Sequence, residues 1–501
     1  MKRTRKRTSN NNSETGTDHR VCLFFAREKE GKIMGKLLSA YLAPHPPVLI
    51  HEIGQGQERQ AGDTLAAMEE IGRDIEQRKP GTIIVITPHG PLFSDAHAIA
   101  LEENLKGDFA SFGHPDLSYS FSNNLDLTYG IVRNALEEGI SIAQMTREMN
   151  KRYGVDGKLD HGVLVPLHFV DKYYSDFKLI PITYGLLSPG ELHVFGRAIE
   201  RAIKAGKDDV CVIASGDLSH KLKSSGPYTF AKEGPEFDRR IMEAIREGDL
   251  VEIGGFPQEL AEKAGECGLR SLQILAGILS IYRISTRVLS YEGPFGVGYG
   301  TAIFDLEGES EEDLLKDIRN RERSAVEVRR RGEDAFVSLA RKSLEYYVRN
   351  GKYLKLPDGL PDDLLEQRYP VFVSIKKNGS LRGCIGATEP TMDNLAREII
   401  HYSVQAGTGD PRFPSVEEDE LQDLVYSVDV LMKPEPVEDP SGLDPSVFGV
   451  IVQKGHRRGL LLPNLEGVDT VEDQLRIALN KAGIGPDEDY SIQRFKVERH
   501  H

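Results

Sequence analysis

The chain has 501 residues, of which 39% are hydrophobic and 28% are charged, and its formal net charge at pH 7 is −15. This length predicts two or three domains, and the acidic balance argues against a nucleic-acid binder, whose affinity depends on Lys and Arg neutralising phosphates. The chain has four cysteines without a Cys-x-x-Cys pair, which argues against a zinc finger or disulfide framework. No apolar run approaches the roughly 20 residues of a membrane span, so we predict a soluble cytoplasmic protein.

The first 33 residues differ in composition from the rest of the chain. Five of the first seven residues are Lys or Arg, and a stretch rich in Ser, Asn and Thr follows. The apolar stretch Val21–Phe25 is too short for the core of a signal peptide. We therefore interpret residues 1–33 as a disordered basic leader. Because Met34 stands just before the first predicted strand, we hypothesise that translation begins there.

Between Leu37 and about Leu306, short apolar runs alternate with amphipathic segments. Strands are predicted at Leu37–Leu42, Thr82–Ile86, Phe177–Thr183, Val210–Ala214 and Tyr299–Phe304, and helices at Ala61–Arg78, Leu127–Glu138, Glu191–Ala205, Glu236–Glu247 and Leu269–Ile281. Runs rich in Val and Ile without polar alternation are typical of strands buried on both faces. A strand–helix–strand unit implies a parallel pair with a right-handed crossover. We predict one α/β domain over residues 34–306, with a mostly parallel central sheet.

The composition changes again after residue 306. Residues 307–332 are dense in charges of both signs, and we assign 307–324 to a charged linker that could form a solvated helix. Residues 325–501 predict a second, α+β domain. Its helices are expected at Asp334–Asn350 and Asp393–Gln405, and its strands at Val371–Lys376, Leu381–Ile385, Leu424–Leu431 and Phe448–Gln453. The Asn-Gly pair at 378–379 is a strong hairpin signal between the first two strands.

Three histidines, His45, His89 and His220, follow three of the predicted strands of the first domain. In an open α/β sheet such strand ends face a common crevice, where ligands bind. Two imidazoles and one carboxylate can hold Fe(II) with open positions, and His45 and His89 are the candidate imidazoles. His220 suits an acid–base role, because an imidazole exchanges protons near neutral pH. His161 could orient a substrate, but it could equally be a loop histidine beside a packed strand.

The third ligand must come from a later segment, and residues 265–268 (Gly-Glu-Cys-Gly) are the best candidate. They precede the helix predicted from Leu269, and a helix N-terminus stabilises a carboxylate or a thiolate. Glu266 would complete an iron site that reacts with oxygen. Cys267 would instead give a softer site, suited to zinc or copper. We favour Glu266 and leave Cys267 open.

These motifs together resemble the LigB-type class III extradiol dioxygenases and the related Memo family. The resemblance rests on Pro44-His45-Pro46-Pro47, Pro88-His89-Gly90, Asp160-His161-Gly162 and Gly216-Asp217-Leu218-Ser219-His220. It implies an Fe(II) site with His45, His89 and Glu266 as ligands, with His220 as the base that deprotonates a catechol and His161 beside it. The implied reaction opens the ring of a small aromatic diol with O2. Memo-like proteins resemble this chain at Cys267-Gly268, which favours a metal-binding role without ring cleavage as the alternative.

The second domain carries a different resemblance. The run Leu381-Arg382-Gly383-Cys384-Ile385-Gly386 is characteristic of the AMMECR family, and Asp410-Pro411-Arg412-Phe413 and residues 426–431 extend the match. The biochemical role of that family is not established. A LigB/Memo-like domain followed by an AMMECR domain resembles proteins of the AmmeMemoRadiSam system, which implies a radical S-adenosylmethionine protein as a partner. A third hypothesis is a modification enzyme in which Cys384 is the nucleophile, although a small buried strand residue is the simpler interpretation.

Overall fold

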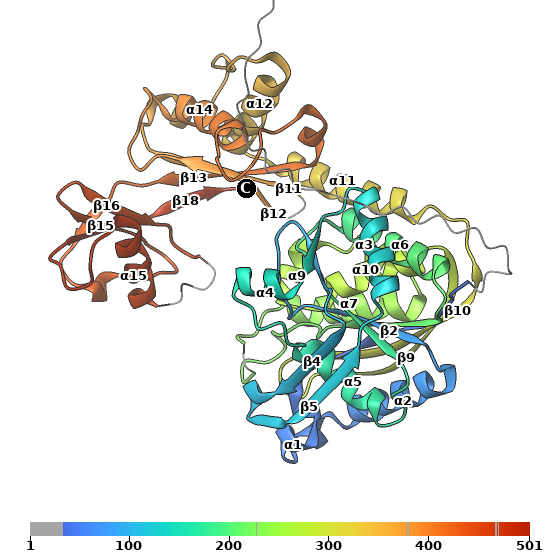
Figure 1. Cartoon of the computed structure of the whole chain (residues 1–501). Helices are drawn as coiled ribbons and strands as arrows, with labels where there is room; N and C mark the ends of the chain where they lie inside the picture. Colours follow the sequence, from blue (N-terminus) through green and yellow to red (C-terminus); the bar gives the residue numbers. More distant parts are fainter. Residues whose placement is uncertain (1–33, 227, 378–379, 466–467, 469) are drawn as a thin grey trace, which may run out of the picture.

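The computed structural model describes residues 34–226, 228–377, 380–465, 468 and 470–501. The predicted basic leader and the predicted Asn-Gly turn at 378–379 lie outside these residues. Figure 1 shows a large N-terminal domain around one sheet and a C-terminal domain with two smaller sheets, with helix α11 (Leu314–Gly332) between them. No helix in the described part of the chain is long and apolar enough to cross a membrane.

The N-terminal domain is built on an eight-stranded sheet with the strand order β6-β3-β7-β2-β8-β1-β10-β9. The strands are β1 (Leu37–Ala43), β2 (Thr82–Thr87), β3 (His97–Ala100), β6 (Ile142–Met145), β7 (Lys178–Thr183), β8 (Val210–Ser215), β9 (Tyr282–Glu292) and β10 (Tyr299–Glu309). The four central strands β7, β2, β8 and β1 are parallel. The sheet becomes mixed because β3 pairs antiparallel with β7, and β10 with both β1 and β9. The predicted α/β class is confirmed.

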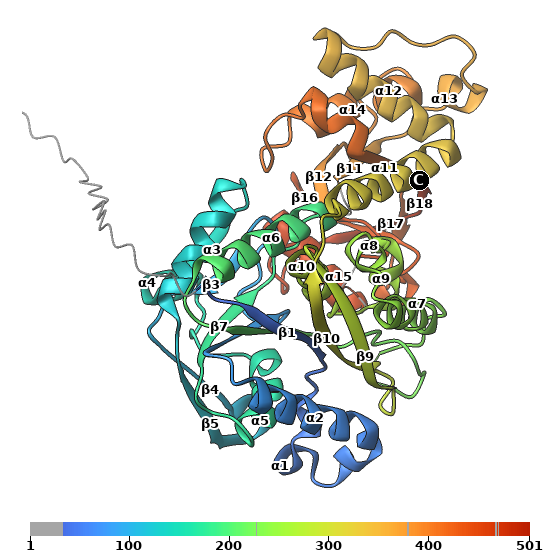
Figure 2. The same cartoon turned by 90° about the vertical axis from the view of Figure 1, so that its right-hand side faces the viewer.

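Helices cover both faces of this sheet (Figures 1 and 2). They are α2 (Gly62–Arg78), α3 (Leu125–Glu137), α5 (His161–Asp171), α6 (Pro189–Ala205), α7 (Glu233–Glu247), α8 (Leu250–Gly254), α9 (Gln258–Ala264) and α10 (Leu269–Leu279). Alternate strand residues enter two different cores, since side chains of a strand point to opposite faces. Ile84 and Val212 belong to the core that includes α3, α6 and α10, and Val85 and Ile213 to the core with α2 and α5.

The apolar segment after His161 is helical, whereas one of the two interpretations of that histidine placed it in a loop beside a packed strand. His161 is the first residue of α5, Asp160 is the N-cap, and Pro166 lies inside the helix. Residues 162–167 are all buried. A short run that is apolar on every side does not distinguish a buried helix from a buried strand, so its periodicity carried no information here.

The charged segment between the domains forms helix α11, and β10 extends into the region that we assigned to the linker. Ile318 of α11 is fully buried in the N-terminal domain. Farther along the helix, Arg329 pairs with Glu259 of α9 at 2.6 Å. Arg330 donates a hydrogen bond of 2.5 Å to the carbonyl oxygen of Leu421 in the C-terminal domain. The charges are therefore used in contacts that connect α11 to both domains.

The C-terminal domain has two four-stranded antiparallel sheets. The first contains β11 (Val371–Lys377), β12 (Ser380–Gly386), β13 (Leu424–Leu431) and β18 (Val497–His500), and is covered by α12 (Ala335–Asn350) and α14 (Leu395–Thr408), with α13 (Asp362–Glu366) beside α14. The second contains β14 (Glu435–Val437), β15 (Gly449–Lys454), β16 (Arg457–Leu461) and β17 (Ser491–Phe495), with α15 (Val471–Ala482) against it. This arrangement confirms the predicted α+β class of the second domain.

Strand β12 carries the Leu-Arg-Gly-Cys-Ile-Gly run. A Cβ atom at Gly383 would lie 2.0 Å from the carbonyl oxygen of Ala406 in α14, so only glycine allows the helix to pack this closely. Arg382 donates two hydrogen bonds to Glu420, at 3.1 and 2.9 Å. Burial alone would raise the pKa of Glu420, but the hydrogen bonds from Arg382 and Lys377 dominate and lower it to about 2.

His97, at the start of β3, gives the fold a pH dependence outside the candidate site. Its fully buried ring stacks on Phe195 at a centroid distance of 3.9 Å, and its Nδ1 accepts a hydrogen bond from the Gly185 N–H. Burial lowers the pKa of His97 to about 3. The unfolded chain, with an ordinary pKa of about 6.5, therefore binds more protons than the folded one between these values, and stability falls as the pH falls through this window.

We expect the low pKa of folded His97 to decrease the free energy of unfolding by about 3 kcal/mol between pH 6.5 and pH 4. Urea unfolding of the full chain at both pH values measures it. His97→Gln retains a hydrogen-bond acceptor but does not titrate, so its stability should fall less over the same interval. Equal pH dependence in the two proteins would show that His97 is protonated in the folded state.

Candidate metal centre

Two histidines meet at the ends of β2 and β1, the parallel strands on either side of β8. Strands β2, β8 and β1 are neighbours in the sheet, and His89 and His45 each lie two residues beyond the end of β2 and β1. Their Nε2 atoms are 2.9 Å apart. His45 is 2% exposed, and His89 lies closer to the surface. The loops that follow the strands thus place two imidazoles at the carboxyl edge of the sheet.

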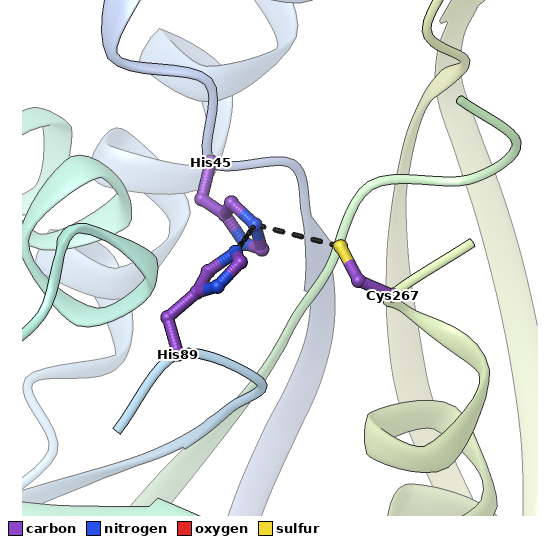
Figure 3. A group of neighbouring side chains, drawn as sticks. All are labelled: His45, His89 and Cys267. Atoms are coloured by element: carbon purple, nitrogen blue, oxygen red, sulfur yellow. Dashed lines mark hydrogen bonds between the residues drawn. The ribbon is translucent and has the colours of Figure 1, made fainter. Parts of the chain in front are cut away.

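Cys267 brings a third donor to the same point. It precedes α10, and its Sγ lies 3.6 Å from His45 Nε2 (Figure 3). The ligating atoms of His45, His89 and Cys267 all lie within 4.8 Å of one another. Within the described ranges, no other set of three or more His, Cys, Asp or Glu side chains converges in this way.

The hydrogen bonds of His45 fix which of its nitrogens faces the centre. Its Nδ1 lies 2.8 Å from Ser215 Oγ, and Ser215 Oγ donates its single proton to the Gly162 carbonyl oxygen at 2.5 Å. His45 Nδ1 must therefore donate to Ser215, which assigns the proton to Nδ1. Its Nε2 presents a lone pair to His89 and Cys267. Metal-bound histidines commonly donate their second ring nitrogen in this way.

The donor set fits a metal ion. Burial lowers the pKa of both His45 and His89, so both imidazoles are neutral at pH 7. With the proton of His45 on Nδ1, the 2.9 Å contact is a hydrogen bond in which His89 Nε2–H donates to His45 Nε2. A bound metal would take the place of that proton and accept both Nε2 lone pairs, and Cys267 would add a polarisable donor.

The Cys267 side chain is a protonated thiol, and its sulfur contacts a backbone N–H group. Burial raises the pKa of Cys267 well above its ordinary value, and the nearby carboxyl groups of Asp217 and Glu266 raise it further. Its Sγ accepts a hydrogen bond of 3.3 Å from the Asp217 N–H. A metal binds the thiolate form, so binding at this site would release the thiol proton. The Asp217 N–H would then stabilise the negative sulfur.

Glu266, which we favoured as the third ligand, has a different partner. Its Oε2 accepts a hydrogen bond of 2.6 Å from the Leu269 N–H and so caps the first turn of α10. Burial raises the pKa of Glu266 to about 7. The structure brings Cys267, and not Glu266, into the group with the two histidines. The two side chains are adjacent in sequence, but one turns to the helix end and the other to the strand ends.

His161 and His220 lie beside the group without joining it. The His161 ring stacks on His89 at a centroid distance of 4.2 Å and meets His45 edge-on at 5.4 Å. The His220 ring stacks on Tyr228 at 5.2 Å. Burial, with a smaller contribution from the neighbouring His89, lowers the pKa of each to about 4. For neither ring do the described residues offer a hydrogen-bond partner, so both are available to a ligand.

Three residues that support the site were given no role in the sequence analysis: Ser215, Asp217 and Asp238. Asp217 Oδ1 accepts a hydrogen bond from the His45 N–H at 2.9 Å, which ties the loop after β8 to the loop after β1. Asp238 of α7 accepts from the Ser219 N–H at 2.8 Å and so holds the loop that carries His220. The positions of Ser215 and Asp217 at the end of a buried strand could have indicated that they support the site. No local pattern indicates the role of Asp238, because its partner is distant in sequence.

A cavity of about 400 Å³ opens next to His89 and His161. This volume lies within the range of about 300–1,000 Å³ typical of small-molecule sites. Its apolar walls come from β3, β4 (Asn104–Phe109), β6 and the adjacent loops, and include Ala98, Ala100, Leu105, Phe112, Met145 and Val155. Its polar wall includes Asp160 and the ion pair of Lys158 with Asp108 at 2.7 Å. A ligand of one ring fits beside the histidines.

The Cys384 thiol lies in the other domain, on β12. Ser374 Oγ donates to its Sγ at 3.2 Å, and its N–H donates to Asp410 at 2.9 Å. Arg412 pairs with Asp410 at 2.6 Å. These contacts fix the strand to the 410–413 loop. Cys211, Cys267 and Cys384 are free thiols.

The sheet topology and the His–His–Cys group define an α/β protein with a candidate metal centre at the carboxyl edge of its sheet. Comparison with known families identifies the family. Residues 39–302 match the catalytic LigB subunit of aromatic ring-opening dioxygenase, and residues 337–500 match AMMECR1. The chain therefore belongs to the LigB family and carries an AMMECR1 domain behind it, which confirms the resemblance seen in its motifs.

Relatives with the whole architecture or one part of it are known. Protein CA_C1420 of Clostridium acetobutylicum is 42% identical over 462 residues, which cover 92% of this chain and 98% of that protein. A Thermotoga maritima protein is 54% identical over 171 residues, 34% of this chain and 98% of its own. Among solved structures, the uncharacterized protein PH0010 of Pyrococcus horikoshii covers 33% of this chain and 88% of its own, with 34% identity and a TM-score of 0.31. The uncharacterized protein JW3007 of Escherichia coli K12 covers 54% and 99%, with 11% identity and a TM-score of 0.36.

Proposed function

We propose that the N-terminal domain is a metal-dependent dioxygenase that opens the ring of a small catechol-like diol. The observation that carries this proposal is the convergence of His45, His89 and Cys267 within 4.8 Å, beside a cavity of about 400 Å³. The LigB family match gives the domain the fold of ring-opening dioxygenases. We propose these three residues as the metal ligands, with Cys267 in place of Glu266.

Fe(II) is the metal that we propose for the reaction, although a site with a thiolate also suits zinc or copper. When bound, the ion would supply positive charge that favours the ionised diol, together with open coordination positions. His45 is positioned for this role by Ser215 and by Asp217, which fix its ring and its backbone. Cys267 would bind as a thiolate, and a reducing compartment such as the cytoplasm would keep it available.

The two remaining histidines would act on the substrate. His220 lies beside the ligand group with both ring nitrogens free of partners in the described part of the chain, so it can accept the first proton of the diol. His161, stacked on His89 at 4.2 Å, lines the cavity and would donate a hydrogen bond to the bound ring substituents. The apolar walls would exclude water from the ring while leaving the diol edge at the histidines.

A second candidate function is metal binding without ring cleavage. In this role the protein would bind a partner protein. The thiol in the ligand group favours it, because the iron sites that use two histidines complete their set with a carboxylate. A radical S-adenosylmethionine protein is the partner that the domain pairing implies. Its binding remains a proposal.

Oxygen uptake after anaerobic loading with Fe(II) tests the proposal. With a panel of catechols, the wild-type chain should consume one O2 per diol and yield a product that contains both oxygen atoms, detected by mass spectrometry. His220→Gln should keep the metal but lose roughly 100- to 10,000-fold in rate. His51→Gln is the matched control, since His51 is exposed. Retained metal with no uptake for any diol would favour the second candidate.

A further inference from the structure

A second cavity lies entirely within the C-terminal domain. It has a volume of about 450 Å³, and it is formed by the segment that connects α12 to α13 and by α14. Figures 1 and 2 show this connecting segment on the side of the domain away from the N-terminal domain. The lining residues are Tyr353, Leu354, Lys355, Leu356, Met392, Arg397, Ile400 and His401. Neither the candidate metal centre nor the family match accounts for this cavity.

One wall of the cavity is a fixed aromatic surface. The rings of Tyr353 and His401 stack at a centroid distance of 5.9 Å with an angle of 12° between their planes. Gln405 donates a hydrogen bond of 3.1 Å to the Tyr353 hydroxyl, and Tyr347 packs against the Tyr353 ring at 5.3 Å. Tyr353 is nevertheless 43% exposed. A planar aromatic ring can therefore stack on a surface whose orientation is already fixed.

The charges around the cavity have one sign. Lys355 and Arg397 line it, and the described residues provide neither side chain with an ion-pair or hydrogen-bond partner. No carboxylate lines the cavity, although the chain as a whole has a net charge of −15. Two unpaired cations beside an aromatic surface attract a ligand that joins a ring to an anion. A phosphate monoester, with about two negative charges at pH 7, matches two cations better than a carboxylate does.

We propose that this cavity binds a nucleoside monophosphate, with the base stacked on Tyr353 and the phosphate between Lys355 and Arg397. The apolar side chains of Leu354, Leu356 and Ile400 would contact the base and sugar. The cavity volume of about 450 Å³ suits a ligand of this size. This assignment gives the AMMECR1 domain a ligand site that does not depend on the chemistry of the metal centre.

Isothermal titration calorimetry of the full chain with AMP, adenosine and inorganic phosphate tests the proposal. AMP should bind at least about tenfold more tightly than either fragment, because the fragments each lose one of the two contacts. Arg397→Gln and Tyr353→Ala should each weaken AMP about tenfold, a value typical of a lost charge-assisted or stacking contact. Tyr353→Phe should bind AMP as the wild type does, which separates loss of the ring from misfolding.

Lys342→Gln is the matched control, because Lys342 is an exposed cation of the same domain outside the cavity. It should leave AMP binding unchanged. The proposal is overturned if AMP does not bind, or if inorganic phosphate binds as tightly as AMP. It is also overturned if Arg397→Gln and Lys342→Gln weaken AMP binding equally, since that result would indicate only a general attraction of anions.

Discussion

Cys267→Ala is expected to remove the metal from the N-terminal domain, whereas Glu266→Gln is expected to retain it. The Cys267 sulfur lies 3.6 Å from His45 Nε2, while the Glu266 carboxylate accepts a hydrogen bond from the Leu269 N–H. Loss of a direct ligand should weaken binding by more than about 100-fold, since loss of an outer partner alone costs roughly 10- to 100-fold. Metal content after equilibrium dialysis against Fe(II) and Zn(II) measures this difference.

Two variants control this comparison. Glu266→Gln keeps an amide oxygen that can accept from Leu269, so α10 should begin normally. Cys384→Ala removes a free thiol of the other domain and should leave the metal content at the wild-type value. If Glu266→Gln lost the metal while Cys267→Ala kept it, the carboxylate set that we first favoured would be the correct one. The His–His–Cys group would then be a feature of the metal-free chain.

Arg382→Ala is expected to destabilise the C-terminal domain by about 3 kcal/mol, the cost of leaving a buried carboxylate without its main partner. Arg382 and Glu420 are 12% and 14% exposed, and their contact has two hydrogen bonds. Arg382 also donates to the Pro414 carbonyl oxygen at 2.8 Å. Lys377 remains within 3.0 Å of Glu420, so part of the ion pairing is kept. Urea unfolding followed by circular dichroism measures the loss.

Arg458→Ala is the matched control for Arg382→Ala. Arg458 pairs with Glu389 at 2.7 Å, but Glu389 is 76% exposed. Its removal should cost no more than about 1 kcal/mol. Equal effects of the two variants would contradict a structural role for the Leu-Arg-Gly-Cys-Ile-Gly run. Arg382 would then be better explained as a ligand-binding residue.

Much of the fold could be predicted from local patterns. Apolar runs gave the positions of β1, β2, β7 and β8, rich in Leu and Ala in β1 and in Val or Ile in the other three, because a strand buried on both faces consists mostly of apolar residues. The positions of His45 and His89 just beyond such strands were enough to predict that they meet. The two edge strands of the large sheet, β6 and β9, were not predicted. The edge strand β9 alternates between exposed and half-buried residues and lacks a continuous apolar run.

The motifs alone predicted the class of both domains, their families and two of the three members of the His–His–Cys group. Only the folded chain shows that Cys267, and not Glu266, is the third member. Glu266 and Cys267 are neighbours at the start of α10, and no local pattern tells which one faces the histidines. That choice depends on the packing of α10 against the sheet and on the Leu269 N–H, which takes the Glu266 carboxylate as its partner. The orientation of a side chain at a helix end is set by contacts with residues far away in the sequence, and only the folded chain contains them.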